Sequence, residues 1–380
     1  EVRVNVPRPE YPRPDLRRAE WRNLNGLWDF AFDDRDQGLA EGWHRQGPFG
    51  QKIVVPYPFE SRLSGIGDPA PHPILWYRRH FQAERPERGQ RLLLHLGAVD
   101  YEATVWLNGH ELGSHRGGYT PFSFDVTGHV VRGENTLVLR AVDTLSRDQP
   151  RGKQYWREDP TGIWYDRTSG IWQTVWLEPV NPAYLQDLRI TPNLDDASVT
   201  VQARGIGGTG KTSVKVQVLD GRKVVQEGVI DQMISTRSIP PQIRPSIKLS
   251  VPNPKLWSPD SPFLYGLRVT LLQDGKRVDE LESYFGMRKI AVAKDASGIN
   301  RLMLNNKPVF QFGPLDQGFW PDGLYTAPTD EALRYDIEMT KKLGFNMARK
   351  HVKVEPARWY YWCDKLGLLV WQDMPSGDKY

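Results

Sequence analysis

Polar side chains that could do chemistry follow three short apolar segments near the C-terminal end of the sequence. Asp316 comes after the first segment, Arg349 and His351 lie at the end of the second, and Asp373 comes after the third. The planar guanidinium of Arg349 could bind a carboxylate with two parallel hydrogen bonds, and an ion pair inside the fold would use the same geometry. Asp373 could bind a substrate, a metal ion or only its own loop. We interpret Lys350 as a solvated lysine.

The segments that carry these side chains alternate between strand and helix patterns. Short apolar runs predict strands at residues 309–312, 345–349 and 368–372. Amphipathic stretches predict a helix over 330–343, with Thr329 as its N-cap, and a second helix over 355–366, ended by Gly367. This order favours parallel strands with right-handed connections. Cys363 in the second helix has no base or metal partner near it in sequence, which indicates a buried structural thiol.

Three strands and two helices bury too little apolar surface for a complete α/β domain. We therefore expect the chain to be truncated inside a larger domain, and a compact three-stranded addition is the alternative. An uncovered edge on strand 368–372 would favour homo-oligomers.

The sequence before residue 289 has the pattern of β-sandwiches. Residues 1–182 contain alternating strands such as 92–96, 103–107 and 136–140, with an Asn108-Gly109 hairpin turn, and suit a jelly roll. Residues 183–288 contain strands such as 198–203, 213–218 and 264–271 and suit an immunoglobulin-like sandwich. Residues 235–245 form a loop or an interrupted strand. We predict a multi-domain, mainly β chain, with residues 289–380 starting a β/α domain.

Composition excludes several classes of protein. The 380 residues suggest two to three domains. A net charge of +4 gives no strong positive field for nucleic acid, and no apolar run approaches the length of a membrane helix. The single cysteine excludes an internal disulfide. The 14 Trp and 15 Tyr suit short strands and also a surface that stacks on sugar rings. The first residue is not Met, which indicates a processed product, so the localisation stays unknown, with a periplasmic or secreted protein as our guess.

The order of these parts and several local motifs resemble glycoside hydrolase family 2, the group of β-galactosidases, β-glucuronidases and β-mannosidases. The resemblance covers nearly the whole chain. The motifs that carry it are LNGLWDF at 24–30, VPYPFE at 55–60, WYRR at 76–79, VWLNG at 105–109, SGIWQTVWLE at 169–178, LWSP at 256–259 and FGMR at 285–288.

The resemblance implies a jelly-roll sugar-binding-type domain, an immunoglobulin-like domain and the first units of a (β/α)8 barrel. It implies a retaining exo-β-glycosidase that uses two glutamates, without an organic cofactor and with a metal ion in some members. The acid/base of this family follows an Asn, and the chain contains no Asn-Glu pair. We therefore assign no catalytic residue and expect an inactive chain from a β-galactosidase-like parent. A non-catalytic carbohydrate-binding or scaffold protein is the alternative.

The resemblance also suggests which residues bind a carbohydrate, the expected partner. The ends of barrel strands carry the site of such a fold. Asp316 is a candidate acceptor for a sugar hydroxyl, or a residue that only shapes its loop. Arg349 and His351 resemble the family's Asn-x-x-Arg motif and the His that follows it, although the spacing to His351 is shorter here. Asp373 is a third candidate. Trp164, where galactosidase-type relatives have an Asp, could stack on a sugar or pack beneath its loop.

Overall fold

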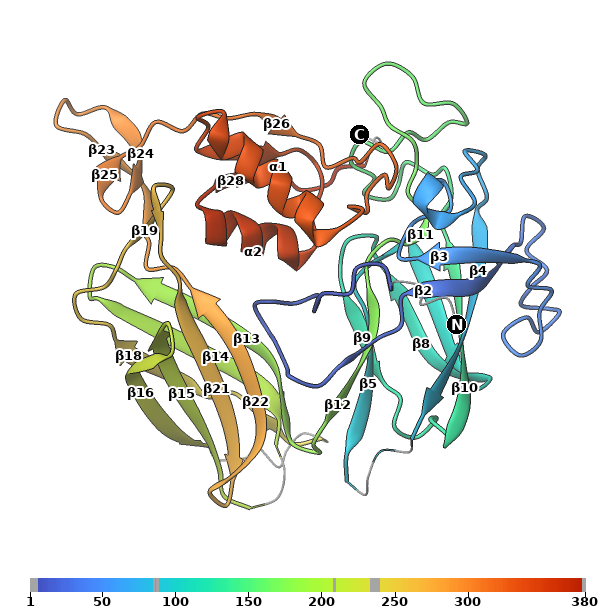
Figure 1. The fold of residues 1–380 in the computed structure, drawn as a ribbon, viewed down its shortest axis with the longest axis horizontal. Helices are drawn as coiled ribbons and strands as arrows, with labels where there is room; N and C mark the ends of the chain where they lie inside the picture. Colours follow the sequence, from blue (N-terminus) through green and yellow to red (C-terminus); the bar gives the residue numbers. More distant parts are fainter. Residues whose placement is uncertain (1–5, 85, 87–88, 208–209, 233–239, 378–380) are drawn as a thin grey trace.

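A computed structural model describes residues 6–84, 86, 89–207, 210–232 and 240–377. Two β-sandwiches lie side by side, and a smaller unit with two helices lies across one end of both (Figure 1). The fold is therefore multi-domain and mainly β, as the sequence predicts. No helix of the described residues is long and apolar enough to cross a membrane.

The first sandwich has the two facing sheets of a jelly roll. The larger sheet has the order β3-β2-β4-β10-β7-β8, the smaller has the order β1-β12-β5-β9, and β6 pairs with β11. The strands of the larger sheet are β2 (Gly26–Phe32), β3 (Gln51–Val55), β4 (Ile74–Ala83), β7 (Glu102–Leu107), β8 (His110–Arg116) and β10 (Gly133–Val142). The others are β1 (Arg22–Asn23), β5 (Arg91–Leu96), β9 (Phe122–Asp125), β12 (Val175–Val180), β6 (Val99–Asp100) and β11 (Gly170–Ile171).

Alternating apolar side chains fill the space between these two sheets. Trp28 and Leu75 from the larger sheet pack in one core with Leu94 and Leu177 from the smaller sheet. A short 3-10 helix, η1 (Arg62–Ser64), follows β3. The predicted hairpin is confirmed, because Asn108 and Gly109 join β7 to β8 with positive φ angles of 52° and 80°.

The second sandwich holds its own apolar core between two antiparallel sheets. One sheet has the order β16-β15-β21-β22, and in the other β14 pairs with β13, β17 and β18. These strands are β13 (Tyr184–Asn193), β14 (Ser198–Ile206), β15 (Thr212–Asp220), β16 (Lys223–Gln232), β17 (Gln242–Ile243), β18 (Ser246–Ser250), β21 (Tyr265–Gln273) and β22 (Lys276–Phe285). Of the predicted loop 235–245, residues 235–239 lie outside the described residues, and β17 occupies part of the remainder.

The C-terminal unit contains a parallel sheet with the order β26-β27-β28. Its elements are β26 (Leu315–Asp316), α1 (Asp330–Lys342), β27 (Met347–Lys350), α2 (Ala357–Leu366) and β28 (Leu369–Gln372). Two small antiparallel sheets precede it, with strands β19 (Trp257–Ser258), β20 (Ser261–Pro262), β23 (Ile290–Lys294), β24 (Asn300–Leu304) and β25 (Lys307–Pro308).

The predicted first strand of this unit is wrong in position. Residues 309–312 form no regular strand, and the pairing with β27 begins at Leu315. The physical reason is exposure: Phe310 is 83% exposed and Phe312 is 45% exposed, whereas Val309 packs against the buried cluster of Trp257, Met347 and Leu369. The helix ends are close to those predicted. Thr329 accepts a hydrogen bond from the backbone N–H of Ala332, and Gly367 ends α2 with a φ of 85°.

A buried ionic group ties the two sandwiches together. Glu178 in β12 is fully buried and pairs with Arg13 at 3.0 Å, Arg18 at 3.1 Å and His95 at 3.1 Å. Arg18 also pairs with Asp279 of β22 at 2.8 Å, which links the two sandwiches. Burial raises the pKa of Glu178, but the bond to His95 and the charges of the arginines lower it more, so its pKa lies below its ordinary value.

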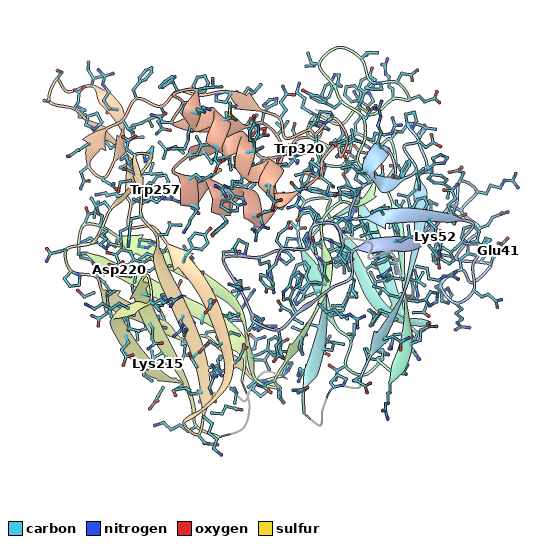
Figure 2. All side chains as sticks on the ribbon, viewed as in Figure 1. Glu41, Lys52, Lys215, Asp220, Trp257 and Trp320 are labelled. Atoms are coloured by element: carbon cyan, nitrogen blue, oxygen red, sulfur yellow. The ribbon has the colours of Figure 1, made fainter. Side chains whose placement is uncertain are left out.

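Helix α2 is held against the second sandwich by Asp364. The indole of Trp257, which lies between the sandwich and the C-terminal unit (Figure 2), donates to the backbone carbonyl of Asp364 at 2.7 Å. The carboxylate of Asp364 accepts from Tyr284 at 3.1 Å and from Arg288 at 2.8 Å. The orientation of the parallel sheet is therefore fixed by contacts from outside it.

Candidate functional site

The three parallel strands bring their C-terminal ends to one edge of the sheet. In the strand register Asp316 lies opposite Lys350, and Lys350 lies opposite Gln372. His351 and Asp373 follow at the next positions, and Asp373 donates its backbone N–H to the carbonyl of Lys350 at 3.0 Å. The structure thus brings together Asp316, His351 and Asp373, which the sequence analysis selected one by one.

Arg349 and His351 both bind the carboxylate of Asp373. The Nε of Arg349 lies 3.1 Å from Oδ1 and 3.0 Å from Oδ2 of Asp373, and Nδ1 of His351 lies 3.0 Å from Oδ2. Hydrogen bonding from Arg349 holds the pKa of Asp373 below its ordinary value. The sequence left two partners open for Arg349, a carboxylate of the site or an ion pair within the fold, and the structure contains the ion pair with Asp373. The group is partly open to solvent, since the Arg349 side chain is 47% exposed.

A second ionic group lies beside the first and is buried. The Nζ of Lys350 lies 2.7 Å from Asp316 and 3.0 Å from Glu355. The Nζ of Lys353 lies 3.0 Å from the same oxygen of Glu355. Burial acts to lower the pKa of both lysines. For Lys350 the charges of the two carboxylates outweigh the effect of burial, and its pKa is raised. For Lys353 burial has the larger effect, and its pKa falls to about 8.

The interpretation of Lys350 as a solvated lysine is wrong. Its side chain is 1% exposed and lies over the ring of Trp359, 4.2 Å from the ring centre. A lysine so deep in the fold requires an acidic partner, and two carboxylates supply it.

Asp316 uses both of its carboxylate oxygens within the fold. Oδ1 accepts the backbone N–H of Gly318 at 2.9 Å, which shapes the loop after β26, and Oδ2 faces Lys350. The side chain remains 28% exposed. Asp316 therefore has the loop-shaping contact considered as one alternative, and a role in binding a sugar hydroxyl stays a prediction.

A long loop of the jelly roll, residues 143–169, reaches this edge of the sheet. The backbone N–H of Arg151 donates to Ser376 at 2.9 Å, and the hydroxyl of Tyr325 donates to the carbonyl of Arg151 at 3.3 Å. The ring of Tyr165 stacks on Phe319, with 4.1 Å between ring centres. In Figure 1 this loop lies beside the C-terminal end of the chain. The strand ends and the loop thus form one surface.

Trp164 packs within that loop. Its ring lies 4.8 Å from the ring of Trp156 at 79° and 6.2 Å from that of Tyr155, and the Nζ of Lys153 lies 5.0 Å from its centre. Trp164 is half-buried. These contacts are those of a residue that packs beneath its loop, and stacking of Trp164 on a sugar stays a prediction.

A buried polar cluster supports the base of the loop. Ser169 donates its hydroxyl to Asp143 at 2.7 Å and its backbone N–H to Glu60 at 3.2 Å. Gln154 donates its side-chain amide to Asp100 at 2.9 Å. Burial, above all, raises the pKa of Glu60 to about 8 and the pKa of Asp100 well above its ordinary value.

Sequence reasoning missed Lys353 and Glu355 at this edge. A usable signal existed, because His351 to Pro356 alternate charged and apolar side chains directly after a strand and before a helix. Two lysines and a glutamate in such a short connection between buried elements indicate internal pairing.

These residues do not suit a resident metal ion. The carboxylate oxygens of Asp316 and Asp373 are occupied by Lys350, Gly318, Arg349 and His351. Among the residues that the structure describes, no group of three His, Cys, Asp or Glu side chains has the arrangement of a metal site. We derive no step through a metal.

Two family models match the two sandwiches. The model of the glycosyl hydrolases family 2 sugar binding domain matches residues 21–178, and the model of glycosyl hydrolases family 2 matches residues 183–288. The chain belongs to glycosyl hydrolases family 2. The resemblance noted in the sequence is thereby confirmed.

Similar proteins extend this relationship beyond the sandwiches. A putative β-glucuronidase of Formosa agariphila is 26% identical over 97% of this family 2 chain, and a β-galactosidase of Thermoanaerobacter pseudethanolicus is 27% identical over 80% of it. The chain spans 32% and 39% of the lengths of these two relatives. The fold is also that of the β-glucuronidase of Bifidobacterium dentium, with a TM-score of 0.77 and 23% identity over 98% of this chain and 63% of that one.

Proposed function

We propose that these 380 residues are the N-terminal part of a retaining exo-β-glycosidase that removes a terminal β-linked sugar. The proposal divides the chain into a sugar-binding-type domain at 1–182, an immunoglobulin-like domain at 183–288 and the first β/α units of a barrel at 289–380. The observation that carries it is the edge at which β26, β27 and β28 end together, lined by Asp316, His351 and Asp373 and flanked by the jelly-roll loop.

Among the strand-end groups, Asp373 has a part in binding the substrate of this reaction. A retaining glycosidase needs two carboxylates about 5 Å apart, one as nucleophile and one as acid and base, and we place both in further barrel strands. Asp373, held ionised by Arg349, accepts hydrogen bonds from sugar hydroxyls. Oδ1 accepts a hydrogen bond from Arg349 alone, whereas Oδ2 faces both Arg349 and His351, so Oδ1 can accept a further hydrogen bond without rearrangement. The 380 residues alone are inactive under this proposal.

The charges at the strand ends favour a neutral sugar. Arg349 is paired with Asp373, Lys350 with Asp316 and Glu355, and Lys353 with Glu355. A uronic acid carries a carboxylate that needs a cation, and at these described strand ends each of the three cations already has an acidic partner. We therefore propose that the substrate is a β-galactoside, and that a β-glucuronide is hydrolysed less efficiently.

The test compares this chain with the longest polypeptide that its gene encodes. Both are assayed on aryl β-galactoside, aryl β-glucuronide and aryl β-mannoside. The proposal expects hydrolysis by the longer form alone, with the highest kcat/KM for the galactoside. Activity of the 380-residue chain would place the catalytic carboxylates among the residues described above and refute the proposed division. Inactivity of the longer form on all three substrates would favour a non-catalytic carbohydrate-binding protein.

A further inference from the structure

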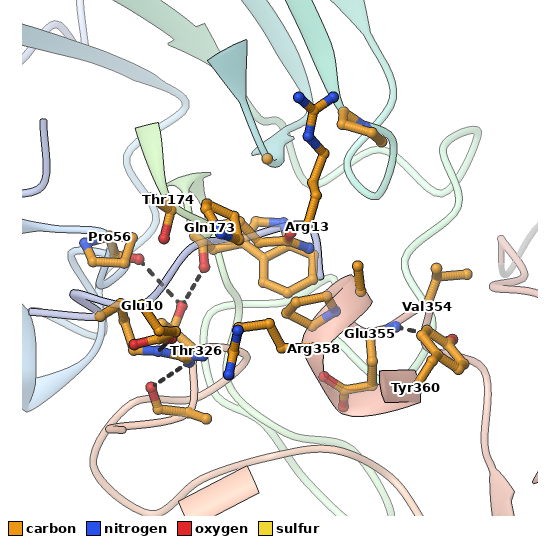
Figure 3. Close-up of a pocket in the computed structure, with 18 of the residues that line it drawn as sticks. Glu10, Arg13, Pro56, Gln173, Thr174, Thr326, Val354, Glu355, Arg358 and Tyr360 are labelled. Atoms are coloured by element: carbon orange, nitrogen blue, oxygen red, sulfur yellow. Dashed lines mark hydrogen bonds and ion pairs between the residues drawn. The ribbon is translucent and has the colours of Figure 1, made fainter. Parts of the chain in front are cut away.

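The loop that follows β26, residues 317–326, runs from the strand-end edge to the jelly roll. At its far end the hydroxyl of Thr326 lies 2.7 Å from the backbone carbonyl oxygen of Trp172 and 3.2 Å from that of Pro56. Figure 3 shows the contact of Thr326 with Pro56 and, on the other side of the same pocket, Glu355 before helix α2. The end of the loop that lies away from the sheet is therefore fixed by the jelly roll.

One buried ammonium group holds the rest of this loop. The Nζ of Lys353 donates to the backbone carbonyl oxygen of Gly318 at 2.5 Å and to that of Tyr325 at 2.9 Å. Its third contact is the carboxylate of Glu355 at 3.0 Å, and the side chain is fully buried. An ammonium has three hydrogens, so these three acceptors use all of them. Lys353 therefore has no hydrogen left for a substrate, and its contacts act on the loop.

The loop lies against Lys353 without room for a side chain at Gly318. Gly318 has a φ of 69°, and a Cβ atom there would lie 2.4 Å from Oε1 of Glu355 and 2.6 Å from Cδ of Lys353. The backbone N–H of the same glycine donates to Oδ1 of Asp316 at 2.9 Å. Lys353 and Asp316 thus bind the two backbone polar groups of one residue. The position that Lys353 imposes on Gly318 is passed on to the carboxylate of Asp316.

The held segment also contacts the jelly roll. The hydroxyl of Tyr325 lies 3.0 Å from that of Tyr119, and the ring of Phe319 stacks on Tyr165 of the jelly-roll loop. The Nζ of Lys353 lies 4.5 Å from the centre of the Tyr325 ring. The ammonium of Lys353 therefore lies where the strand ends, the loop after β26 and the jelly roll meet.

We propose that Lys353 is a positioning residue of the sugar-binding edge: by holding residues 317–326 it keeps Asp316 oriented to accept a hydrogen bond from a hydroxyl of the terminal sugar. This inference rests on the proposed function, because it requires a sugar at the strand ends. Without Lys353, Asp316 and Glu355 both keep their ion pairs with Lys350. The expected loss is therefore one of orientation and not of charge pairing.

The first experiment needs no enzymatic activity. Hydrogen exchange at pH 7, measured by mass spectrometry, is compared between the 380-residue chain and its Lys353→Met variant. The backbone N–H groups of Trp320 and Leu324 donate to each other's carbonyl oxygens at 2.8 and 3.0 Å, so peptides that cover 317–326 report the order of the loop. We expect exchange there to be at least about tenfold faster in the variant, with exchange over 330–342 unchanged. Equal exchange of 317–326 in the two folded proteins would overturn the proposal.

Lys341→Met is the matched control. The Nζ of Lys341 also donates to two backbone carbonyl oxygens, those of Pro259 at 2.6 Å and Gly367 at 2.8 Å. Gly367 precedes β28, so this contact lies at the opposite edge of the parallel sheet. The control should leave exchange over 317–326 unchanged. Faster exchange there in both variants would show a general loosening and refute the assignment to Lys353.

A second variant perturbs the same contact from the side of the loop. Gly318→Ala adds the Cβ atom for which Lys353 and Glu355 leave no room. We expect it to speed exchange over 317–326 as Lys353→Met does, and it keeps the test decisive if Lys353→Met does not fold. Unchanged exchange in a folded Gly318→Ala variant would contradict the proposed contact.

The second experiment measures kcat and KM of the longest encoded polypeptide on an aryl β-galactoside. Lys353→Met should raise KM at least about fivefold and change kcat less than about threefold, because it weakens binding of the sugar. Asp316→Asn should show the same pattern, and the double variant should be no worse than the weaker single variant, since both act through one contact.

The alternatives give different results in these kinetics. A lower kcat at constant KM is what a smaller folded fraction produces, and it would overturn the proposal in favour of a structural role. Additive effects of Lys353→Met and Asp316→Asn would show that Lys353 does not act through Asp316. Inactivity of the parent on all three aryl glycosides would refute the proposed function, and the exchange experiment would then judge the contact between Lys353 and the loop separately.

Discussion

Replacing Glu60 by Gln should remove a pH dependence from the stability of the chain. Glu60 is buried beneath the jelly-roll loop, where its Oε2 accepts the backbone N–H of Ser169 and its Oε1 has no partner in the described structure. Burial, with a smaller contribution from the charge of Asp143, raises its pKa from 4.5 to about 8. In the unfolded chain the same carboxyl ionises at its ordinary pKa.

The sign and size of the effect follow from this difference. Below about pH 4.5 the carboxyl is protonated in both states, so burial carries no ionic penalty. Between about pH 4.5 and 8 the unfolded chain releases the proton and the folded chain retains it, so the free energy of unfolding falls as the pH rises. At about 1.4 kcal/mol for each pKa unit, the full loss is about 5 kcal/mol, as an order of magnitude. Glu60→Gln keeps the shape of the side chain and has no proton to lose.

The assay is urea unfolding of both proteins at pH 5, 6, 7 and 8, followed through the transition of the first sandwich. The stability of Glu60→Gln relative to the parent should rise by several kcal/mol between pH 5 and pH 8. Glu84→Gln is the control, since the Glu84 side chain is 80% exposed, and its stability should run parallel to that of the parent. A difference between Glu60→Gln and the parent that stays constant over this range would refute the reasoning.

Three further changes test other parts of the structure. Glu178→Gln should destabilise the chain by about 3 kcal/mol at pH 7, because it leaves buried Arg18 without that partner. The pKa of Glu178 is lowered in the folded chain, so the stability that its charge supplies is lost as the pH falls below about 4. The difference in stability between the parent and Glu178→Gln should therefore shrink over that range, and a difference in thermal melts that stays constant would contradict this. Thr329→Ala should cost about 1 kcal/mol through the lost cap of α1, measured by chemical denaturation, and Thr329→Ser should restore most of it. Asp373→Asn should reduce kcat/KM of the longer polypeptide at least about tenfold and change the stability by less than about 1 kcal/mol, because its ion pair is partly exposed. A loss of stability equal to the loss of activity would show a structural role instead.

The fold was predictable where apolar periodicity and turn chemistry agree. Strands β5, β7 and β10 lie where alternating apolar residues predict them, and the Asn108-Gly109 turn has the expected positive φ angles. The prediction of a strand at 309–312 failed because periodicity indicates that a segment is apolar but not which surface buries it. Phe310 and Phe312 are exposed, and the pairing to β27 starts further along the chain.

The sequence predicted where the residues of the candidate site lie, but not which of their side chains form ion pairs with one another. The order of strands and helices indicated that polar residues after each strand would meet at one edge. It could not show that Arg349 and His351 share the carboxylate of Asp373, because those contacts depend on the register between strands. The burial of Lys350 was also hidden, since it requires Glu355 from the following connection to fold back onto it.

The most direct test of the proposed site is a crystal structure of the longest encoded polypeptide with an S-linked β-galactoside that is not hydrolysed. We predict that the terminal galactose lies against the C-terminal ends of β26, β27 and β28, with a hydroxyl within hydrogen-bond distance of Asp373. A galactose bound elsewhere, with the strand ends in contact only with protein, would contradict the proposed function of these residues.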